Sequence, residues 1–163
     1  MVDVATIIDD EPGSFTNGGG SLTHRKLCEI GKDWLLSAKR CNPVFVERSG
    51  GEEIPDVIGW NSEECFVIEC KTSIEDYRAD QKKGHRFCGG LGIYRYYLVP
   101  AELADKIPND TGWGLISVSF ASNFNAYIAR QVRCRGSKQF ERSPLKEVKY
   151  LQKRIMDIQR YGL

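Results

Sequence analysis

The chain has 163 residues, a length that suits one domain at about 100 to 200 residues per domain. Hydrophobic residues make up 41% of it and charged residues 28%, so the chain can bury a core and is neither disordered nor fibrous. Its apolar runs are far shorter than the ~20 residues that span a bilayer, and its acidic N-terminus lacks the basic and apolar parts of a signal peptide. We therefore expect a globular cytoplasmic protein, in a host's cytoplasm if it is phage-encoded, with no membrane partner.

The first predicted elements are an arm and a helix. Residues 1–20 end in three glycines, and their composition predicts a flexible N-terminal arm. Ser21 or Thr23 can cap a helix that runs to about Lys39, because apolar residues recur there at three- and four-residue steps. These apolar residues are Leu27, Ile30, Trp34, Leu35 and Ala38.

Five segments are then typical of strands. Asn42-Pro43 ends the helix, and residues 44–47 form the first predicted strand. Residues 54–60 and 65–71 predict a hairpin joined by the polar turn 61–64, and the apolar run within 65–71 indicates an interior strand. Two more strands are expected at 93–99 and 113–118.

The remaining elements complete an α/β pattern. Helices are expected at 74–83, capped by Ser73, and at 100–107, and a last helix follows Leu145 after a loop over 119–144. This order predicts an α/β fold with a central mixed sheet of about four to five strands flanked by helices. We expect a core domain at 21–120, and a basic loop with a C-terminal helix at 121–163 that packs on the core or extends it.

The net charge of +1 hides a basic C-terminal end. Residues 130–163 hold ten Lys or Arg and three Asp or Glu, net +7, so residues 1–129 carry −6. The basic end is a candidate phosphate-binding surface, and a solvated helix with a basic loop is the simpler alternative. The candidate nucleic-acid contacts in it are Arg130, Arg133, Arg135, Lys138 and Arg142.

The six cysteines form no CxxC pair and no regular framework, which indicates free thiols that are mostly buried. Two looser pairs remain, His24 with Cys28 and His85 with Cys88. Together they could supply four zinc ligands at unusual spacing, so a structural zinc protein is one alternative.

The most informative stretch is Pro55-Asp56 followed, after twelve residues, by Glu69-Cys70-Lys71. Side chains alternate along a strand, so Glu69 and Lys71 share one face and Cys70 points to the other. The hairpin brings Asp56 opposite Glu69, and converging carboxylates favour a divalent cation such as Mg²⁺, with Mn²⁺ as a substitute. Such an ion activates water for phosphodiester hydrolysis, while Lys71 orients or deprotonates that water or neutralises the phosphate.

The acid-x-Lys pattern is not specific by itself, because it also occurs at 80–82 and at 147–149. Those two copies fall in predicted helices, where residues two apart point about 200° apart and cannot face one site. The copy at 69–71 alone has strand context and an upstream Pro-Asp. A surface Glu-Lys pair on an edge strand is its alternative, and the apolar residues 66–68 disfavour that alternative.

Residues 54–60 (Ile-Pro-Asp-Val-Ile-Gly-Trp) and 67–72 (Val-Ile-Glu-Cys-Lys-Thr) resemble the two motifs of the PD-(D/E)XK nuclease superfamily. Residues 76–83, 94–100 and 113–115 are similar to segments of a small bacterial and phage branch, so the resemblance covers roughly 22–118. It implies a restriction-endonuclease-like fold with Asp56 and Glu69 as metal ligands. It also implies the Cys70 carbonyl as a third ligand and Lys71 as the catalytic lysine.

The resemblance extends to the helices. Family members often add a glutamate from the first helix, and Glu29 is the residue at that place, with an exposed helix glutamate as its alternative. Other branches carry a Gln-x-x-x-Tyr motif after the lysine strand. Here Gln81 is followed by His85, which argues against the RecB-like exonuclease branch. The basic residues of this helix, Arg78, Lys82 and Lys83, either contact phosphates or line a solvated face.

Two functions stay open at this point. The first is a Mg²⁺-dependent deoxyribonuclease, an endonuclease in preference to an exonuclease. Its partner is DNA, and its specificity comes from DNA structure, from a second copy of the chain or from a protein partner. The second is a nucleic-acid-binding or phage regulatory protein that keeps the fold without cutting. The intact set of Asp56, Glu69 and Lys71 favours the nuclease.

Overall fold

A single mixed sheet of seven strands organises the chain, in the order β1-β7-β6-β5-β4-β3-β2. The computed structural model describes residues 6–9, 22–46, 54–82, 90–109, 112–133 and 140–162, with the backbone alone for 6–9. The strands are β1 (Thr6–Asp9), β2 (Val44–Val46), β3 (Val57–Trp60), β4 (Cys65–Cys70), β5 (Tyr94–Pro100), β6 (Gly114–Ala121) and β7 (Ala126–Arg133). The helices are α1 (His24–Ala38), α2 (Ile74–Asp80), α3 (Ala101–Ala104) and α4 (Pro144–Tyr161).

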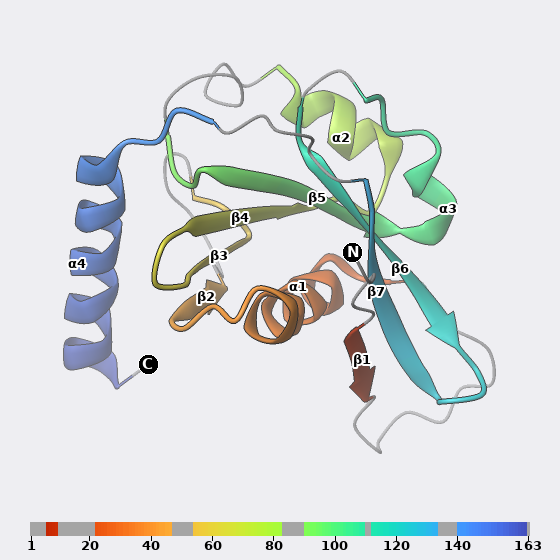
Figure 1. The fold of residues 1–163 in the computed structure, drawn as a ribbon, viewed down its shortest axis with the longest axis horizontal. Helices are drawn as coiled ribbons and strands as arrows, with labels where there is room; N and C mark the ends of the chain where they lie inside the picture. Colours follow the sequence, from red (N-terminus) through yellow and green to blue (C-terminus); the bar gives the residue numbers. More distant parts are fainter. Residues whose placement is uncertain are drawn as a thin grey trace.

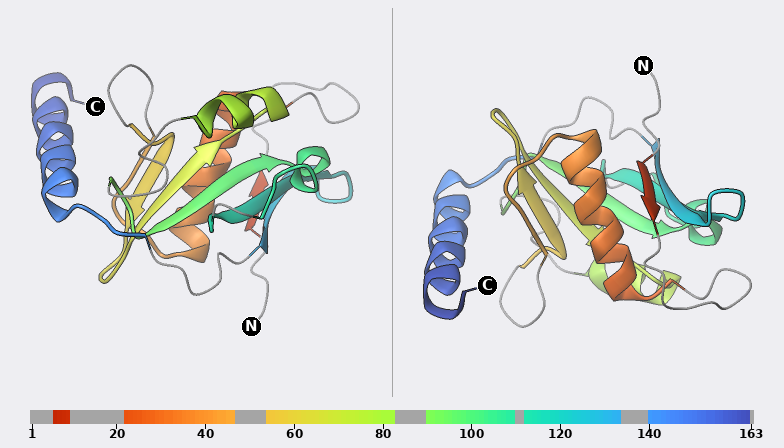
Figure 2. Two further views of the ribbon diagram at one scale, coloured as in Figure 1. Left: turned by 90° about the horizontal axis from the view of Figure 1, so that it is seen from above. Right: turned by 90° about the horizontal axis from the view of Figure 1, so that it is seen from below.

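The helices form layers on both sides of this sheet. Helix α1 lies across one face, while α2 and α3 lie on the other (Figure 1). The views from above and below place α4 beside the end of the sheet that carries β2 and β3 (Figure 2). Strands β4, β5 and β6 run parallel, and the other neighbouring pairs are antiparallel. The prediction of an α/β fold with a mixed sheet between helices is confirmed.

Helix α1 forms where its apolar spacing predicts it. The Thr23 hydroxyl caps it by accepting a hydrogen bond from the backbone N–H of Lys26 at 3.2 Å. The predicted stripe faces the sheet, with Leu27, Ile30, Trp34 and Leu35 all buried. A Cβ added at Gly31 would lie 3.3 Å from the Val57 side chain, so this glycine lets the helix approach the sheet closely. Helix α1 is therefore packed firmly against the sheet next to the site described below.

Strand β4 is the most buried segment of the hairpin. All six of its residues are buried, with β3 antiparallel on one side and β5 parallel on the other. Its side chains alternate between the two faces: Phe66, Ile68 and Cys70 join the core under α1, and Val67 joins a second cluster. The prediction of an interior strand is confirmed.

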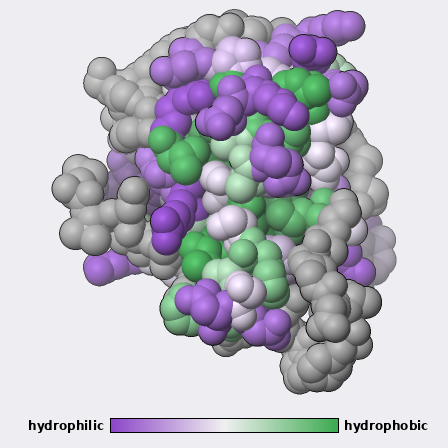
Figure 3. All heavy atoms as spheres, turned by 90° about the vertical axis from the view of Figure 1, so that its right-hand side faces the viewer, coloured by the Kyte–Doolittle hydropathy of each residue, from purple (hydrophilic) through white to green (hydrophobic). Residues whose placement is uncertain are grey.

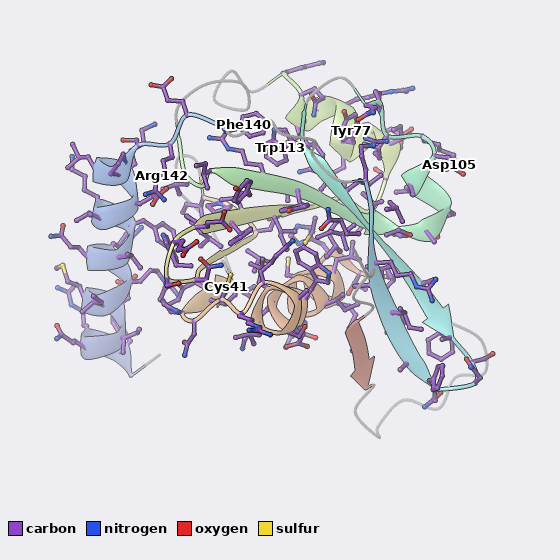
Figure 4. The ribbon with its side chains drawn as sticks, in the orientation of Figure 1. Cys41, Tyr77, Asp105, Trp113, Phe140 and Arg142 are labelled. Atoms are coloured by element: carbon purple, nitrogen blue, oxygen red, sulfur yellow. The ribbon has the colours of Figure 1, made fainter. Side chains whose placement is uncertain are left out.

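The second face of the sheet has an aromatic core of its own. Tyr77 of α2 packs there with Tyr97, Trp113 and Phe140 (Figure 4). The Tyr97 ring stacks on that of Trp113 with centroids 4.5 Å apart, and the Tyr77 ring meets Tyr97 edge-on at 5.1 Å. Cys41 lies on the opposite side of the sheet, towards α1.

The sheet is wider than the four to five strands expected. Residues 119–144 were predicted to be a loop, but β6 continues to Ala121 and β7 occupies Ala126–Arg133. Ala126, Tyr127, Ile128 and Ala129 are buried, so they provide the strand's apolar half, and the basic residues that follow conceal the pattern in the sequence. The domain boundary expected at residue 120 falls inside β6, and β7 belongs to the same sheet.

The predicted N-terminal arm contains a strand. Residues Thr6–Asp9 pair antiparallel with β7, with Thr6 opposite Ala129 and Asp9 opposite Ala126. Backbone hydrogen bonds to β7 hold these residues in a strand that their local composition does not predict. Residues 1–5 and 10–20 of the arm lie outside the described part of the chain.

Other boundaries differ from the prediction by a few residues. Strand β3 begins at Val57 and not at residue 54, because Pro55 has no N–H to donate to a ladder. Helix α2 ends at Asp80 and α3 at Ala104, each three residues before the predicted end.

Glu147 holds α4 against the sheet, although the rest of this helix is largely exposed. The Glu147 carboxylate is buried and accepts hydrogen bonds from the Gly92 N–H at 3.2 Å and the Trp60 indole N–H at 3.4 Å. Arg142, near the start of α4 in Figure 4, pairs with the same carboxylate at 3.8 Å. The Tyr150 ring packs between Trp60 and Phe45, with centroids 6.0 and 6.2 Å away.

The surface is mixed in polarity. On the side that carries α3 and the β6–β7 hairpin, hydrophilic residues gather at the top and hydrophobic residues are visible between polar ones (Figure 3). None of the helices in the described residues has the length and apolar character needed to cross a membrane.

The role of Glu147 can be tested by substitution. We expect Glu147→Ala to lower the free energy of unfolding by about 2 to 3 kcal/mol, because it leaves the buried N–H of Gly92 and the partly buried indole N–H of Trp60 without an acceptor. Urea unfolding followed by Trp fluorescence measures this change. Lys149→Ala, on an exposed position of the same helix, is the control and should change stability by less than about 0.5 kcal/mol. Equal effects of the two substitutions would contradict this account of the docking.

Candidate functional site

Asp56 and Glu69 meet where β3 begins and β4 ends. The register pairs Val57 with Ile68, which sets Asp56 opposite Glu69 at the next position. The Asp56 carboxylate accepts a hydrogen bond through Oδ2 from the backbone N–H of Cys70 at 2.8 Å. The predicted hairpin therefore brings the Pro-Asp motif beside the Glu-Cys-Lys motif.

Glu69 and Lys71 lie on the same face of the sheet, as the alternation of a strand predicts. Lys71 Nζ is 3.6 Å from Glu69 Oε2. Cys70 points the other way, into the core under α1, to which Cys28 also belongs. Burial and the Cys28 thiol raise the pKa of the Cys70 thiol well above its ordinary value, so Cys70 stays protonated.

Three carboxylates surround the Lys71 ammonium. Besides Glu69, Lys71 Nζ is 3.4 Å from Asp80 Oδ1 and 4.0 Å from Asp76 Oδ1. Glu69, Lys71 and Asp80 are all nearly inaccessible, at 3%, 5% and 1% exposure. Burial lowers the pKa of Lys71, but the carboxylates of Glu69, Asp80, Asp76 and Asp56 raise it by more, so that it stands above its ordinary value. Lys71 is therefore a protonated ammonium at neutral pH.

Asp80 is the site residue that sequence reasoning missed. It was read only as the first member of an acid-x-Lys copy on a helix, where that pattern has no geometric meaning. Helix α2 buries Tyr77 and Asp80, three residues apart and hence on one side of the helix, and this side faces β4 and β5. The signal available in the sequence was the three-residue spacing of Tyr77 and Asp80, which places the aspartate on the same side of the helix as an aromatic residue.

Asp80 in turn belongs to a polar chain. The Tyr97 hydroxyl donates to Asp80 Oδ2 at 3.5 Å, and the Gln81 side-chain amide donates to the Tyr97 hydroxyl at 2.6 Å. Tyr94, Tyr96 and Tyr97 are all buried, so these tyrosines belong to the core. Gln81 thus contacts a tyrosine of β5, and the position of His85 lies outside the described residues.

A second group of side chains contacts Asp56 from α1. His24 Nε2 is 3.3 Å from Asp56 Oδ1, and His24 Nδ1 is 3.7 Å from the Cys28 sulfur. Ligand atoms of His24, Cys28 and Asp56 all lie within 4.8 Å of one another. Among the described residues, these three are the potential metal ligands that lie close enough together to hold one ion. The group contains neither Glu69 nor Glu29. The four-ligand zinc site with His85 and Cys88 lies in part outside the described residues.

Glu29 occupies a different position from the one the resemblance implies. Its side chain is 50% exposed and pairs with Arg25 one turn earlier, with 3.2 Å between Oε1 and Arg25 Nε. The helix stripe turns Leu27 and Ile30 to the sheet, which leaves Glu29 on the solvent side. The described structure does not bring Glu29 to the cluster around Lys71.

The predicted nucleic-acid contacts divide into three groups. Arg78, Lys82 and Arg130 are exposed. The Arg133 guanidinium donates to the carbonyls of Ile107 and Pro108, both at 2.8 Å, so this residue ties β7 to the segment after α3. Arg142 is likewise held within the fold, by its ion pair with Glu147, and the remaining three, Lys83, Arg135 and Lys138, lie outside the described residues.

Comparisons with known proteins leave the family open. No protein-family model matches the sequence, and the search of curated proteins finds no match. Among solved structures, a protein of unknown function from Silicibacter pomeroyi, SPO1766, is similar to this chain with a TM-score of 0.44 and 22% identity. The match covers 73% of this chain and 80% of that one.

The buried ammonium predicts a pH-dependent contribution to stability. The pKa of Lys71 is raised in the folded protein, so its contribution is complete below the unfolded value of 10.5 and disappears as the pH rises through the folded value. We expect Lys71→Met to lower the free energy of unfolding by about 3 kcal/mol at neutral pH, since it leaves buried carboxylates without their cation. The difference between the two proteins should shrink above about pH 10.5.

Urea unfolding of both proteins between neutral and strongly alkaline pH measures this difference, and the subtraction removes the titration of the tyrosines. Lys71→Arg, which keeps its charge at high pH, is the control and should retain its stability relative to Lys71→Met across the range. A difference that is constant with pH would contradict the assignment of Lys71 as a buried ammonium.

Proposed function

We propose that this chain is a metal-dependent nuclease that hydrolyses phosphodiester bonds of DNA at the place where β3 begins and β4 ends. The observation that carries the proposal is the buried Lys71 ammonium beside Glu69, one strand from Asp56. A solvated surface pair would not need this burial, and a purely structural pair is costly to bury. The resemblance of the two motifs to PD-(D/E)XK nucleases supports the same reaction class.

The charge balance of the cluster favours a cation. One ammonium lies within 4.0 Å of three carboxylates, those of Glu69, Asp76 and Asp80, so negative charges outnumber positive ones among these four groups when all are ionised. Asp56 adds a fourth carboxylate at the end of the neighbouring strand. Close carboxylates repel one another unless a proton or cation compensates them, which supports a divalent ion as part of the active form.

Mg²⁺, with Mn²⁺ as a substitute, is the ion proposed for hydrolysis. Carboxylate oxygens of Asp56 and Glu69, and the carbonyl of Cys70, are donors of the kind that these hard cations prefer. Such an ion would polarise a phosphoryl oxygen and lower the pKa of a bound water.

The protonation state of Lys71 limits the roles it can have in hydrolysis. An ammonium whose pKa is raised is a poor base at neutral pH, so Lys71 is proposed to orient the attacking water by hydrogen bonding and to neutralise charge on the phosphate. Asp80 and Asp76 hold the ammonium in place, and the bond from Tyr97 fixes Asp80. These three residues are positioning residues for Lys71.

The substrate surface is proposed from the exposed basic residues. Arg78 lies on the exposed side of α2, the helix that also carries Asp80 to the cluster, and Lys82 is exposed in the turn after it, so both are suited to contact phosphates nearby. A second copy of the chain would allow both strands of a duplex to be cut, and a protein partner is the other source of specificity. A nucleic-acid-binding protein that does not cut is the second candidate function, since the fold and basic surface would serve it equally.

Cleavage assays test the proposal directly. We expect the protein to cut at least one of linear, circular, single-stranded and branched DNA in Mg²⁺ or Mn²⁺ and to be inactive in EDTA. Glu69→Gln and Lys71→Met should each lower the rate by about 10² to 10⁴, the range typical of groups that act on a proton or charge in the transition state. Cutting of the circular substrate would identify an endonuclease.

Lys149→Met is the matched control, because it alters a lysine with the same acid-x-Lys spacing on the exposed side of α4. It should cut at the wild-type rate. Each variant's melting temperature shows whether a loss of activity reflects unfolding, and Glu69→Gln keeps the size of the side chain if Lys71→Met is unstable. DNA binding without cutting by any form of the protein would favour the non-cleaving alternative.

Arg130 and Arg133 on β7 offer a matched test of DNA binding. Arg130 is exposed, so Arg130→Ala should weaken binding and reduce the slope of log affinity against log salt by about 1. Arg133→Ala should leave that slope unchanged and instead reduce stability, because it removes two hydrogen bonds to backbone carbonyls. Fluorescence anisotropy of labelled DNA at several salt concentrations measures the slopes. A wild-type slope for Arg130→Ala would exclude β7 from the DNA contact.

A further inference from the structure

We propose that His24, Cys28 and Asp56 form a binding site for a borderline transition-metal ion, best suited to Zn²⁺. The inference goes beyond the proposed hydrolysis, because binding of a metal by these three residues does not require that the chain cut DNA. It also differs from a zinc site built with His85 and Cys88, since its third ligand is a carboxylate from the sheet.

The three ligands converge from two elements. His24 and Cys28 are one turn apart on α1 and therefore lie on the same side of the helix. Asp56 approaches from the segment before β3, and all three residues offer ligand atoms within 4.8 Å of one another. A tetrahedral zinc ion separates nitrogen, sulfur and oxygen ligands by about 3.4 to 3.6 Å. The separations of 3.3 Å from His24 Nε2 to Asp56 Oδ1 and 3.7 Å from His24 Nδ1 to the Cys28 sulfur are near that range, although they involve different ring nitrogens.

The imidazole of His24 now uses a different nitrogen for each neighbour. Nδ1 faces the Cys28 sulfur and Nε2 faces Asp56 Oδ1. A metal ion would bind only one of these nitrogens, so the ring must rotate to bring that nitrogen closer to the ligand that the other nitrogen now faces. The His24 side chain is 50% exposed, and this exposure allows the rotation and gives an ion a path from solvent.

The chemistry of the donors excludes Mg²⁺ as the preferred occupant. Magnesium requires oxygen ligands in octahedral geometry, whereas thiolate and imidazole ligands favour zinc and its neighbours in the first transition series. Cys28 supplies the thiolate on loss of its proton to solvent, and this proton release accompanies metal binding. The resulting set of one nitrogen, one sulfur and one oxygen donor is typical of a zinc ion with three protein ligands.

The protein around the ligands restricts their movement. Asp56 is held by the Cys70 N–H through Oδ2, which leaves Oδ1 for the metal. Cys28 is 4% exposed and lies between buried residues of the α1 stripe. Three protein ligands leave a fourth position for water.

Cobalt binding to the purified full chain tests the site. Co²⁺ replaces zinc in tetrahedral sites and gives visible absorption together with a sulfur-to-cobalt charge-transfer band in the near ultraviolet. We expect one Co²⁺ per chain, a charge-transfer band, displacement by an equal concentration of Zn²⁺ and no displacement by a thousandfold excess of Mg²⁺. Absence of the band, or displacement by Mg²⁺, would overturn the proposal.

Substitutions assign the band to these residues. Cys28→Ser should abolish it, and His24→Ala and Asp56→Asn should each weaken Co²⁺ affinity by about 10-fold or more. Cys41→Ser is the matched control: Cys41 is equally buried, follows the other end of α1, and should keep the full band. A band that survives in both Cys28→Ser and His24→Ala belongs to other cysteines and would overturn the proposal. If Cys28→Ser does not fold, the exposed His24→Ala variant decides the question.

Two further variants separate this site from the proposed hydrolysis. Glu69→Gln and Lys71→Met alter the cluster on the other face of β4 and should bind Co²⁺ as the wild type does. Inactive variants with normal cobalt binding would support the metal site independently of catalysis. A chain that cuts DNA in Mg²⁺ but binds no cobalt would overturn the metal site and leave the proposed function intact.

Discussion

The buried ammonium of Lys71 is the interaction on which the arrangement of this end of the sheet depends. A lysine that is 5% exposed is stable only when opposite charges replace its lost hydration, and three carboxylates lie within 4.0 Å of it. Two of them, Asp76 and Asp80, come from α2, so the ion pairs also fix the helix that follows β4. Tyr97, packed against Trp113, extends the same network into the aromatic core.

Asp56 connects two chemically different environments. On one side it lies next to the end of β4, where Glu69 and Lys71 provide oxygen and ammonium groups suited to a phosphate and a hard cation. On the other side it faces His24 and Cys28, whose nitrogen and sulfur atoms suit a softer metal. One carboxylate thus lies between the two proposed sites, and an ion at either of them would change the electrostatics of the other.

Local sequence patterns were sufficient to predict the elements whose own residues show a clear spacing, cap or apolar run. The stripe of α1, its Thr23 cap, the β3–β4 hairpin and the burial of β4 follow from helical spacing, capping chemistry and apolar runs. The same patterns failed for β1 and β7. Strand β1 is stabilised by backbone bonds to β7, which is far along the chain. Strand β7 pairs with its sequence neighbour β6, but the polar residues that follow its apolar half, including Arg130 and Arg133, conceal the strand pattern.

The sequence by itself determined that Asp56, Glu69 and Lys71 would meet, because a hairpin of known register and the twofold alternation of a strand place them together. Only the tertiary structure decided which other groups join them. Asp80 reaches Lys71 because α2 packs on the sheet, His24 reaches Asp56 because α1 crosses the opposite face, and Glu29 turns to solvent because its neighbours are buried. These contacts depend on how helices lie across strands, and that geometry results from packing of the whole core rather than from the spacing of residues along the chain.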